Sequence, residues 1–226
     1  MLGKQNWVKI PTINKIPNHF PCLVYCKTGE ILGETNSEIL TAEEIAKADK
    51  LLPGLKNNYV ISHVLLRQVL AHFTGIDPDK LLISNLLQGK PFIQNHQIKF
   101  NLSHSKDAVL IAISDMEMGV DMEEIKSDID FDGIMEYAFS QSDKLFCKMH
   151  DLPVAFTQIW TLKEAYLKTL GIGLSIKLKD IDLTGKESAL IKGGFYSQTF
   201  VCPANEIGSI VGIQDLDALQ FFELVF

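Results

Sequence analysis

The sequence predicts an α+β protein built from two similar halves. Short apolar runs rich in strand-forming residues alternate with segments whose apolar residues recur at helical spacing. Both kinds of segment occur before and after about Met118, and the sequence contains no low-complexity tract and no short fixed repeat. With 226 residues, 46% of them hydrophobic, the chain can bury one large core or two small cores packed together.

The first half is predicted to place two helices between strands. Thr41, followed by two glutamates two residues on, is a typical N-cap for a helix that runs to about Leu52 and stops near Pro53. Apolar residues at helical spacing from Asn58 to Phe73 predict a longer helix, which Gly75 ends. The predicted strands are Phe20–Lys27, Leu81–Ser84, Ile98–Leu102 and Ala108–Ser114, with a polar hinge at Ser103–Lys106.

The second half is predicted to begin with a strand, Gly119–Glu123, and to continue with helices. Helical patterns occur at about Asp132–Ala138 and Ser140–Met149, and a long helix from Val154 to Leu170 ends at a glycine. From Asp180 to Phe226, short apolar runs alternate with polar residues, which predicts antiparallel strands.

The composition argues against several classes of protein. Lys and Arg number 21 against 28 Asp and Glu, and the net charge of −7 is not that of a general nucleic-acid binder. The four cysteines are too scattered for a disulfide framework or a zinc site, which favours buried reduced thiols at Cys22, Cys26, Cys147 and Cys202. Because we find neither a signal-peptide pattern nor a run of about 20 apolar residues, we expect a soluble cytoplasmic protein.

Two carboxylates lie two positions apart in the segment Gly119-Val120-Asp121-Met122-Glu123. Side chains at i and i+2 of a strand point to the same face, so Asp121 and Glu123 are expected side by side. Such a pair suits a hard cation such as Mg²⁺, with further ligands from another segment and from substrate phosphates. Taken alone, the pattern is more often a solvated strand face.

A second charged pattern lies on the long predicted helix of the second half. Glu164 and Lys168 are four residues apart and share a helix face, and Lys163 adjoins Glu164. A carboxylate beside two lysines is suited to a metal–pyrophosphate unit, with the carboxylate on the metal and the lysines on phosphate oxygens. Taken alone, a surface ion pair is the simpler interpretation.

The segment Phe100 to Ser105 (FNLSHS) places Ser103 and His104 at the end of a predicted strand. A Ser–His pair suggests nucleophilic hydrolysis, but adjacent strand residues point to opposite sides and the sequence has no G-x-S-x-G turn. We therefore favour contacts with phosphate, with turn capping as the alternative. Taken alone, Lys90 in a Gly-Lys-Pro turn and Arg67 on the second helix indicate no specific function.

Together, the order and spacing of these motifs resemble the Sfp-type phosphopantetheinyl transferases over about half of the chain. The matching segments are GKP at 89–91, FNLSHS at 100–105, GVDME at 119–123 and WTLKEAYLK at 160–168, followed by GIGLS at 171–175. The resemblance implies a pseudo-dimer of two similar α/β halves with the active site in the cleft between them. Residues 1–117 then contact the adenine and 3′-phosphate of coenzyme A, and residues 118–226 carry the metal carboxylates and phosphate-binding lysines.

The resemblance also implies a reaction. The protein is expected to transfer 4′-phosphopantetheine from coenzyme A to a serine of an apo acyl or peptidyl carrier protein of fatty-acid, polyketide or nonribosomal-peptide synthesis, releasing 3′,5′-ADP. It implies Mg²⁺, with Mn²⁺ as an alternative, a monomer, and no nucleic-acid or membrane partner. Two rivals stay open: a metal-dependent hydrolase of a nucleotide pyrophosphate, and an inactive homologue that binds coenzyme A or a carrier.

The same resemblance assigns roles to individual residues. Metal binding falls to Asp121, Glu123 and Glu164, and catalysis to Asp121, Glu164 and Lys168, with Glu164 or a water that it holds accepting the serine proton. Coenzyme A binding falls to Lys47, Lys90, Ser103, His104, Lys163 and Lys168.

Two residues depart from the pattern of that family, and one surface is expected to meet the carrier. Glu44 stands where a basic residue is common, which is expected to weaken the grip on the 3′-phosphate or to shift it to Lys50. Asp143 stands where Glu is favoured. The apolar residues of the 131–150 region form a candidate carrier-docking surface, although residues at helical spacing more often pack inward.

Overall fold

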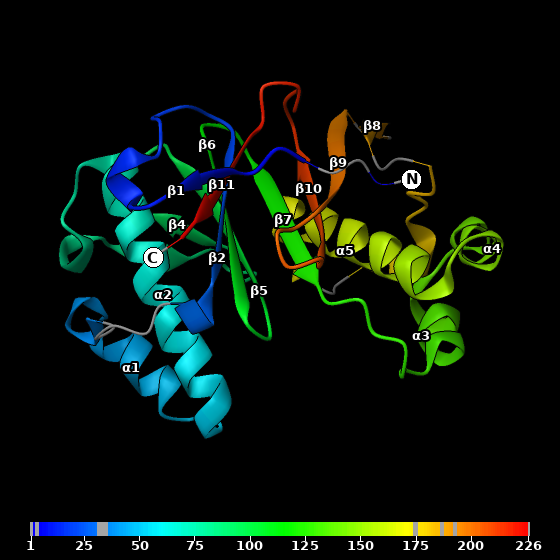
Figure 1. Cartoon of the computed structure of the whole chain (residues 1–226), viewed down its shortest axis with the longest axis horizontal. Coiled ribbons are helices and arrows are strands. Elements are labelled where there is room, and N and C mark those ends of the chain that lie inside the picture. Colours follow the sequence, from blue (N-terminus) through cyan, green and yellow to red (C-terminus); the bar gives the residue numbers. More distant parts are fainter. Residues whose placement is uncertain are drawn as a thin grey trace.

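Two β-sheets pack face to face, and a long helix covers the outer face of each, as Figure 1 shows. The computed structural model describes residues 2, 5–30, 36–173, 176–185, 188–191 and 194–225. It confirms the predicted α+β class. Of the GIGLS motif, Leu174 and Ser175 lie outside the described residues.

The first sheet has five strands in the order β1-β11-β2-β6-β5. They are β1 (Val8–Ile10), β2 (Cys22–Lys27), β5 (Lys99–Ser105), β6 (Ala108–Ser114) and β11 (Gln220–Leu224). The prediction of antiparallel strands is wrong for β11, which lies between β1 and β2 and runs parallel to both. The predicted polar hinge is also wrong, because Ser103–Ser105 continue β5 and pair with β6 up to Ala108.

The second sheet has four antiparallel strands in the order β7-β10-β9-β8. They are β7 (Met118–Glu123), β8 (Ser188–Ile191), β9 (Phe195–Val201) and β10 (Ile207–Gly212). A separate hairpin pairs β3 (Ile83–Asn85) with β4 (Pro91–Ile93). The strand at 119–123 was thus predicted correctly, and its partner β10 lies far away in the sequence.

The helices are α1 (Ala42–Ala48), α2 (Pro53–Thr74), α3 (Phe131–Ala138), α4 (Gln141–Met149) and α5 (Leu152–Leu170). The side chain of Thr41 and the carboxylate of Glu44 form a capping box that starts α1. Pro53 occupies the first turn of α2, where its missing N–H is harmless, so α2 begins earlier than predicted. Gly75 and Gly171 end α2 and α5 in the left-handed conformation that glycine favours.

Hydrophobic side chains form a core on each side of the first sheet. One core lies between that sheet and α2, and a second lies between the two sheets, where Leu110 and Met122 are fully buried. A third core joins α3, α4 and α5. All four cysteines, which lie in the described part of the chain, are buried and form no disulfide. Within the described residues, no helix is both long and apolar enough to span a membrane.

Candidate active site

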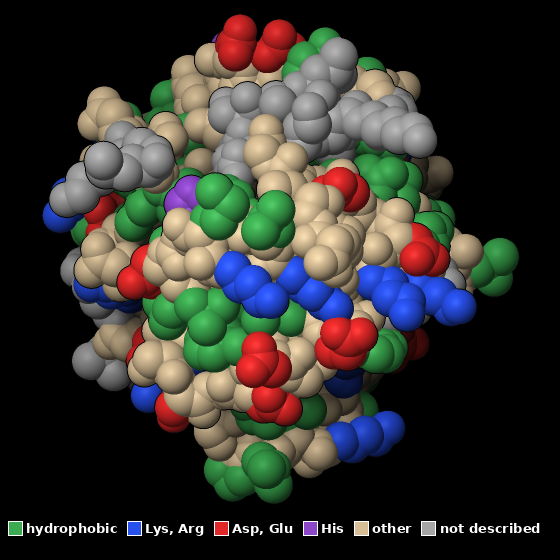
Figure 2. Space-filling view, turned by 90° about the vertical axis from the view of Figure 1, so that its right-hand side faces the viewer, with side chains coloured by type: hydrophobic (Ala, Val, Ile, Leu, Met, Phe, Trp, Pro, Cys, Tyr) green, Lys and Arg blue, Asp and Glu red, His purple; other side chains and the backbone are tan. Residues whose placement is uncertain are grey.

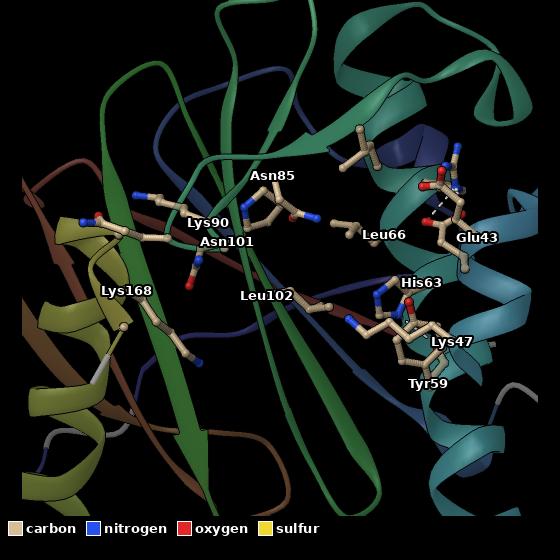
Figure 3. Close-up of a pocket in the computed structure, with 18 of the residues that line it drawn as sticks. Glu43, Lys47, Tyr59, His63, Leu66, Asn85, Lys90, Asn101, Leu102 and Lys168 are labelled. Carbon is tan, nitrogen blue, oxygen red and sulfur yellow. Dashed lines mark hydrogen bonds and ion pairs between the residues drawn. The ribbon is translucent and has the colours of Figure 1, made fainter. Parts of the chain in front are cut away.

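A cavity of about 480 Å³ opens between the helices of the first half and α5. One end is lined by Lys47 of α1 and by Tyr59 and His63 of α2, and the other by Glu164 and Lys168 of α5. Figure 3 shows Lys47, Tyr59 and His63 on one side and Lys168 on the other, with Asn101 and Leu102 between them and Lys90 on the side of Lys168. The cavity therefore has a cationic side chain at each end, a distribution suited to a ligand with two separated anionic groups.

Asp121 of β7 is the most enclosed carboxylate near this cavity, with only 5% of its surface exposed. Its Oδ1 accepts hydrogen bonds from Ser103 Oγ at 2.9 Å and from Lys168 Nζ at 2.7 Å. Its Oδ2 is buried and has no hydrogen-bond partner in the described part of the chain. A buried carboxylate oxygen without a partner is costly, so this atom is poised to bind a cation or a donor that arrives with the ligand.

Ser103 and Asn101 join the edges of the two sheets. Ser103 Oγ accepts a hydrogen bond from the backbone N–H of Met122 at 3.2 Å, and Asn101 Oδ1 accepts one from Val120 N–H at 2.9 Å. These side chains satisfy the N–H groups at the edge of β7 that no neighbouring strand pairs with. The sequence analysis missed Asn101, although its position two residues before Ser103 on one strand places both on the same face.

Glu123 and Glu164 lie within electrostatic range of Asp121. Burial and the charge of Asp121 raise the pKa of Glu123 to about 7. Burial, followed by the same neighbour, also raises the pKa of Glu164 above its ordinary value. Two glutamates whose ionisation is disfavoured by burial and by the charge of Asp121 form an environment that a cation would stabilise. The described residues nevertheless contain no set of three His, Cys, Asp or Glu side chains already gathered in metal-binding positions.

Close contact between β7 and α5 fixes the position of this acidic group. A Cβ atom at Gly119 would lie 2.3 Å from the Ala165 carbonyl oxygen and 2.4 Å from the Thr169 nitrogen. Thr161 Oγ1 and Thr199 Oγ1 each lie 2.9 Å from Ser209 Oγ, which ties α5 to β10 and β9. Glycine and small hydroxyl residues thus let α5 lie against the sheet, bringing Lys168 to Asp121.

Lys163 does not reach the cavity, which corrects its predicted role in binding phosphate. Its side chain is fully buried, and its ammonium lies 2.8 Å from Asp143, which is also fully buried. The same ammonium donates to the carbonyl oxygens of Leu178, at 2.8 Å, and Ile181. At about 100° per residue, a lysine five positions before Lys168 lies about 140° around the helix, so the two cannot face one ligand. Helical geometry was therefore the signal that the prediction overlooked.

Lys90 lines the cavity, but its ammonium points out of it. Lys90 Nζ lies 2.6 Å from Glu117 Oε2 and donates to the carbonyl oxygens of Met118 and Thr169 at 3.1 and 3.0 Å. The charge of Lys90 is therefore already paired within the protein, and its predicted contact with the adenine end of coenzyme A stays a prediction.

Lys47 lies at the end of the cavity that α1 and α2 form, in a cluster with two aromatic rings. Its Nζ is 5.4 Å from the centroid of the Tyr59 ring, which stacks on His63 at 3.7 Å. Burial lowers the pKa of His63, and nearby Lys47 and His104 lower it further. His104 is exposed on β5 and does not line the cavity. Neither Tyr59 nor His63 was predicted from the sequence to line this site.

Glu44, the first departure from the expected pattern, has a structural explanation. Its carboxylate caps α1 and accepts hydrogen bonds from Nε of Arg67, which is only 1% exposed. Arg67 Nη1 also donates to the Pro78 carbonyl oxygen at 2.7 Å. Arg67 and Glu44 thus line the cavity wall as a paired unit, leaving Lys47 to present an ammonium there. The second departure, Asp143, is the buried partner of Lys163 and caps α4.

Comparison with known proteins identifies the class to which this fold and site belong. A model of the 4′-phosphopantetheinyl transferase superfamily matches residues 117–208, and a model of the N-terminal part of 4′-phosphopantetheinyl transferases matches residues 55–116. The two models cover residues 55–208 without a gap. The chain therefore belongs to the Sfp-type family of 4′-phosphopantetheinyl transferases.

Three curated relatives illustrate this similarity. The 4′-phosphopantetheinyl transferase HetI of Nostoc is 27% identical over 155 residues, or 64% of each protein. The 4′-phosphopantetheinyl transferase gsp of Aneurinibacillus migulanus is 30% identical over 59% of this chain and 57% of its own length. The 4′-phosphopantetheinyl transferase Sfp of Bacillus subtilis is 31% identical over 53% of this chain and 54% of its own. The chain thus spans between about half and two thirds of the length of these relatives.

Proposed function

We propose that this protein transfers the 4′-phosphopantetheine group of coenzyme A to a serine of an apo acyl or peptidyl carrier protein. The products are the holo-carrier and 3′,5′-ADP. The observation that carries the proposal is the buried Asp121 carboxylate, one oxygen of which is held by Ser103 and Lys168 while the other is unpaired. The names of the relatives, all 4′-phosphopantetheinyl transferases, support the same reaction.

The active site in this proposal is the cleft between two halves of a pseudo-dimer, residues 1–117 and 118–226. One similarity supports the division, because in each half a long helix covers a sheet (Figure 1). The helix α2 covers the sheet that contains β2, β6 and β5, and α5 covers the sheet that contains β7, β10 and β9. The cavity takes residues from both sides. One strand departs from the division, since β11 comes from the end of the sequence and lies in the first sheet.

Asp121, Glu123 and Glu164 are the residues proposed to hold Mg²⁺, with Mn²⁺ as an alternative. They fit such an ion by their chemistry, because hard oxygen ligands suit it, and by the unpaired Oδ2 of Asp121. Burial and the neighbouring charge of Asp121 raise the pKa of Glu123 and of Glu164, and a cation would relieve this cost. A bound divalent cation supplies neutralisation of the negative charge on the pyrophosphate.

The cavity is proposed to hold coenzyme A by its two anionic parts. The 3′-phosphate lies at the end formed by Lys47, and the pyrophosphate lies at the end formed by Lys168, whose side chain is 29% exposed. Ser103 and His104 were predicted to touch phosphate. The hydroxyl of Ser103 is already bonded to Asp121, so we propose that it orients this carboxylate, and His104 remains a proposed phosphate contact.

Transfer then requires one bond to form and one to break. The carrier serine oxygen attacks the β-phosphorus, which bears the pantetheine arm, and the bond from this phosphorus to the oxygen of the 3′,5′-ADP leaving group breaks. Lys168 stabilises the charge on the phosphates. Glu164, or a water that it orients, accepts the serine proton.

The carrier is proposed to dock on the face that α3 and α4 form. The prediction that apolar residues of the 131–150 region mostly pack inward is confirmed for Met135 and Phe139, which are buried. Tyr137, Leu145 and Met149 are instead between 57 and 81% exposed. Figure 2 shows a row of basic side chains across this side of the molecule, with hydrophobic side chains above and below it and acidic side chains directly below it. The basic row and the exposed apolar side chains are the parts of this face that suit an acidic carrier.

A direct test separates the proposal from its two rivals. The protein is incubated with coenzyme A and Mg²⁺, with and without each of a panel of apo acyl and peptidyl carriers, and 3′,5′-ADP and carrier mass are measured. The proposal predicts 3′,5′-ADP only when a carrier is present, in equal amount to the modified carrier. Release without any carrier would indicate a hydrolase, and no release with any carrier would indicate a binding protein.

A further inference from the structure

Lys90 contacts three acceptors outside its own hairpin. Its turn, between β3 and β4, belongs to the first half, and its ammonium pairs with Glu117 and donates to Met118 O at the start of β7 and Thr169 O in the last turn of α5. The side chain is only 8% exposed. Figure 3 shows Lys90 extending to the α5 side of the cavity, away from Lys47 and His63.

The contact with α5 has a clear physical purpose. The last four carbonyl groups of a helix lack partners within the helix, and they carry the negative end of its dipole. Thr169 O is one of these groups. The ammonium of Lys90 donates a hydrogen bond to it, and its positive charge complements the negative end of the helix dipole. Lys90 therefore caps α5 from a different part of the chain.

The stem of Lys90 packs where α5 ends. A Cβ atom at Gly171 would lie 3.1 Å from Lys90 Cδ and 3.3 Å from Lys90 Cβ. Gly171 also has a φ of +67°, so this position favours glycine for its backbone, and the stem of Lys90 leaves little space beside it. The turn at Lys90 and the end of α5 thus fit together as the wall of the cavity that both of them line.

We propose that Lys90 is a positioning residue that latches the hairpin to β7 and α5. Through this latch, Lys90 fixes the position of the end of α5. It thereby places Lys168, and Glu164 one helical turn before it, relative to Asp121 and to the opposite wall of the cavity. Its ammonium acts on the protein rather than on the ligand. This role goes beyond the proposed reaction, and its structural part does not depend on that reaction.

Three substitutions test the latch. Lys90→Met keeps the stem and removes the charge, whereas Lys90→Arg keeps a charge and donors. Lys99→Met is the matched control, because Lys99 pairs with the same Glu117 at 3.0 Å from a more exposed position, at 38%. Backbone hydrogen exchange at the end of α5 is measured in the protein without ligand, together with kcat and the KM for coenzyme A.

The latch predicts that Lys90→Met speeds exchange in the last turn of α5 and at the start of β7 by about tenfold or more, as expected when a charge-assisted hydrogen bond is lost. It predicts a raised KM with a smaller change in kcat, partial rescue by Lys90→Arg, and wild-type behaviour for Lys99→Met. Unchanged exchange together with weakened coenzyme A binding would overturn the proposal in favour of direct ligand contact. Unchanged exchange and unchanged kinetics would overturn it outright. The exchange result stands even where no carrier is modified, so failure of the reaction is distinguishable.

Discussion

At the scale of single residues, two lysines on one helix show how position decides the role of a charge. Lys168 is 29% exposed, lines the cavity and pairs with Asp121, so its ammonium can exchange a protein partner for a phosphate oxygen. Lys163 is fully buried against Asp143, and burial lowers its pKa despite this ion pair. Removing one member of a buried pair leaves the other charge without compensation.

Substitution separates these two roles. Lys163→Met is expected to destabilise the protein by about 3–5 kcal/mol, because Asp143 stays buried and unpaired. The double variant Lys163→Met/Asp143→Leu is expected to recover part of this loss, because it removes both charges but also the cap that Asp143 provides for α4. Lys168→Met is expected to cost less stability than Lys163→Met, because Lys168 is partly exposed, and to impair transfer. Urea unfolding of all three variants checks this, and a fully stable Lys163→Met protein would contradict the assignment.

The site residues that the sequence predicted best are those whose relation is local. Asp121 and Glu123 share a face of β7 because strand residues alternate, and Glu164 and Lys168 share a face of α5 because a helix turns every 3.6 residues. Both patterns were read correctly. The hydrogen bond from Ser103 to Asp121 could not be predicted from local sequence patterns, because it joins strands from two different sheets.

At the scale of elements, the contact between β7 and α5 decides whether the acidic group forms. Gly119 is buried against the backbone of α5, and no side chain fits there. The glycine of the GVDME segment thus has a packing function, which could not be inferred from the two carboxylates of that segment.

Gly119→Ala tests this contact. The added methyl group would overlap the backbone at Ala165 and Thr169, so a loss of about 1–3 kcal/mol or more in the free energy of unfolding is expected, with reduced transfer. Gly54→Ala is the control, because a Cβ atom there would meet nothing within 4 Å and alanine favours a helix. Chemical denaturation measures both, and equal stability of the two variants would refute the close contact.

The ion pairs of Glu117 give the latch a pH dependence. Burial raises the pKa of Glu117, but Lys90 and Lys99 outweigh this effect and leave it below the ordinary value. A carboxyl group whose pKa is lower in the folded protein than in the unfolded chain, where it is about 4.3, stabilises the fold at pH values above the unfolded-state pKa. This stabilisation is lost as the pH falls through the folded-state pKa. The stability advantage of the wild type over Glu117→Gln should therefore be present at pH 6 and shrink below about pH 4. An advantage that grows on acidification would contradict this sign.

At the scale of the whole molecule, β11 is the feature that the sequence concealed most completely. Its apolar pattern predicted a strand, but nothing local shows that residues 220–224 pair in parallel with β2, about 200 positions earlier. Parallel pairing over such a separation depends on tertiary packing. The fold class and most elements were predictable from periodicity and caps, whereas the membership of each sheet was not.

A fragment experiment follows from this topology. Residues 1–117 contain the helix α2 and four strands of the first sheet but lack β11, which lies between β1 and β2. Without β11, β1 and β2 each lose a hydrogen-bonding partner, and the core loses the buried side chains of Phe222 and Leu224. The fragment is therefore not expected to show a cooperative unfolding transition when followed by circular dichroism. Adding a peptide of residues 214–225 should restore a transition, and a cooperative transition of the fragment alone would contradict the prediction.

The central claim is that Asp121 and Glu164 support transfer of phosphopantetheine rather than stability alone. The most direct measurement is the mass of an apo carrier after incubation with coenzyme A, Mg²⁺ and either wild type, Asp121→Asn, Glu164→Gln or the control Glu124→Gln. Wild type and Glu124→Gln are expected to add one phosphopantetheine to the carrier, whereas both site variants are expected to stay folded but to transfer about 10²–10³-fold or more slowly. Normal rates for both site variants would contradict it.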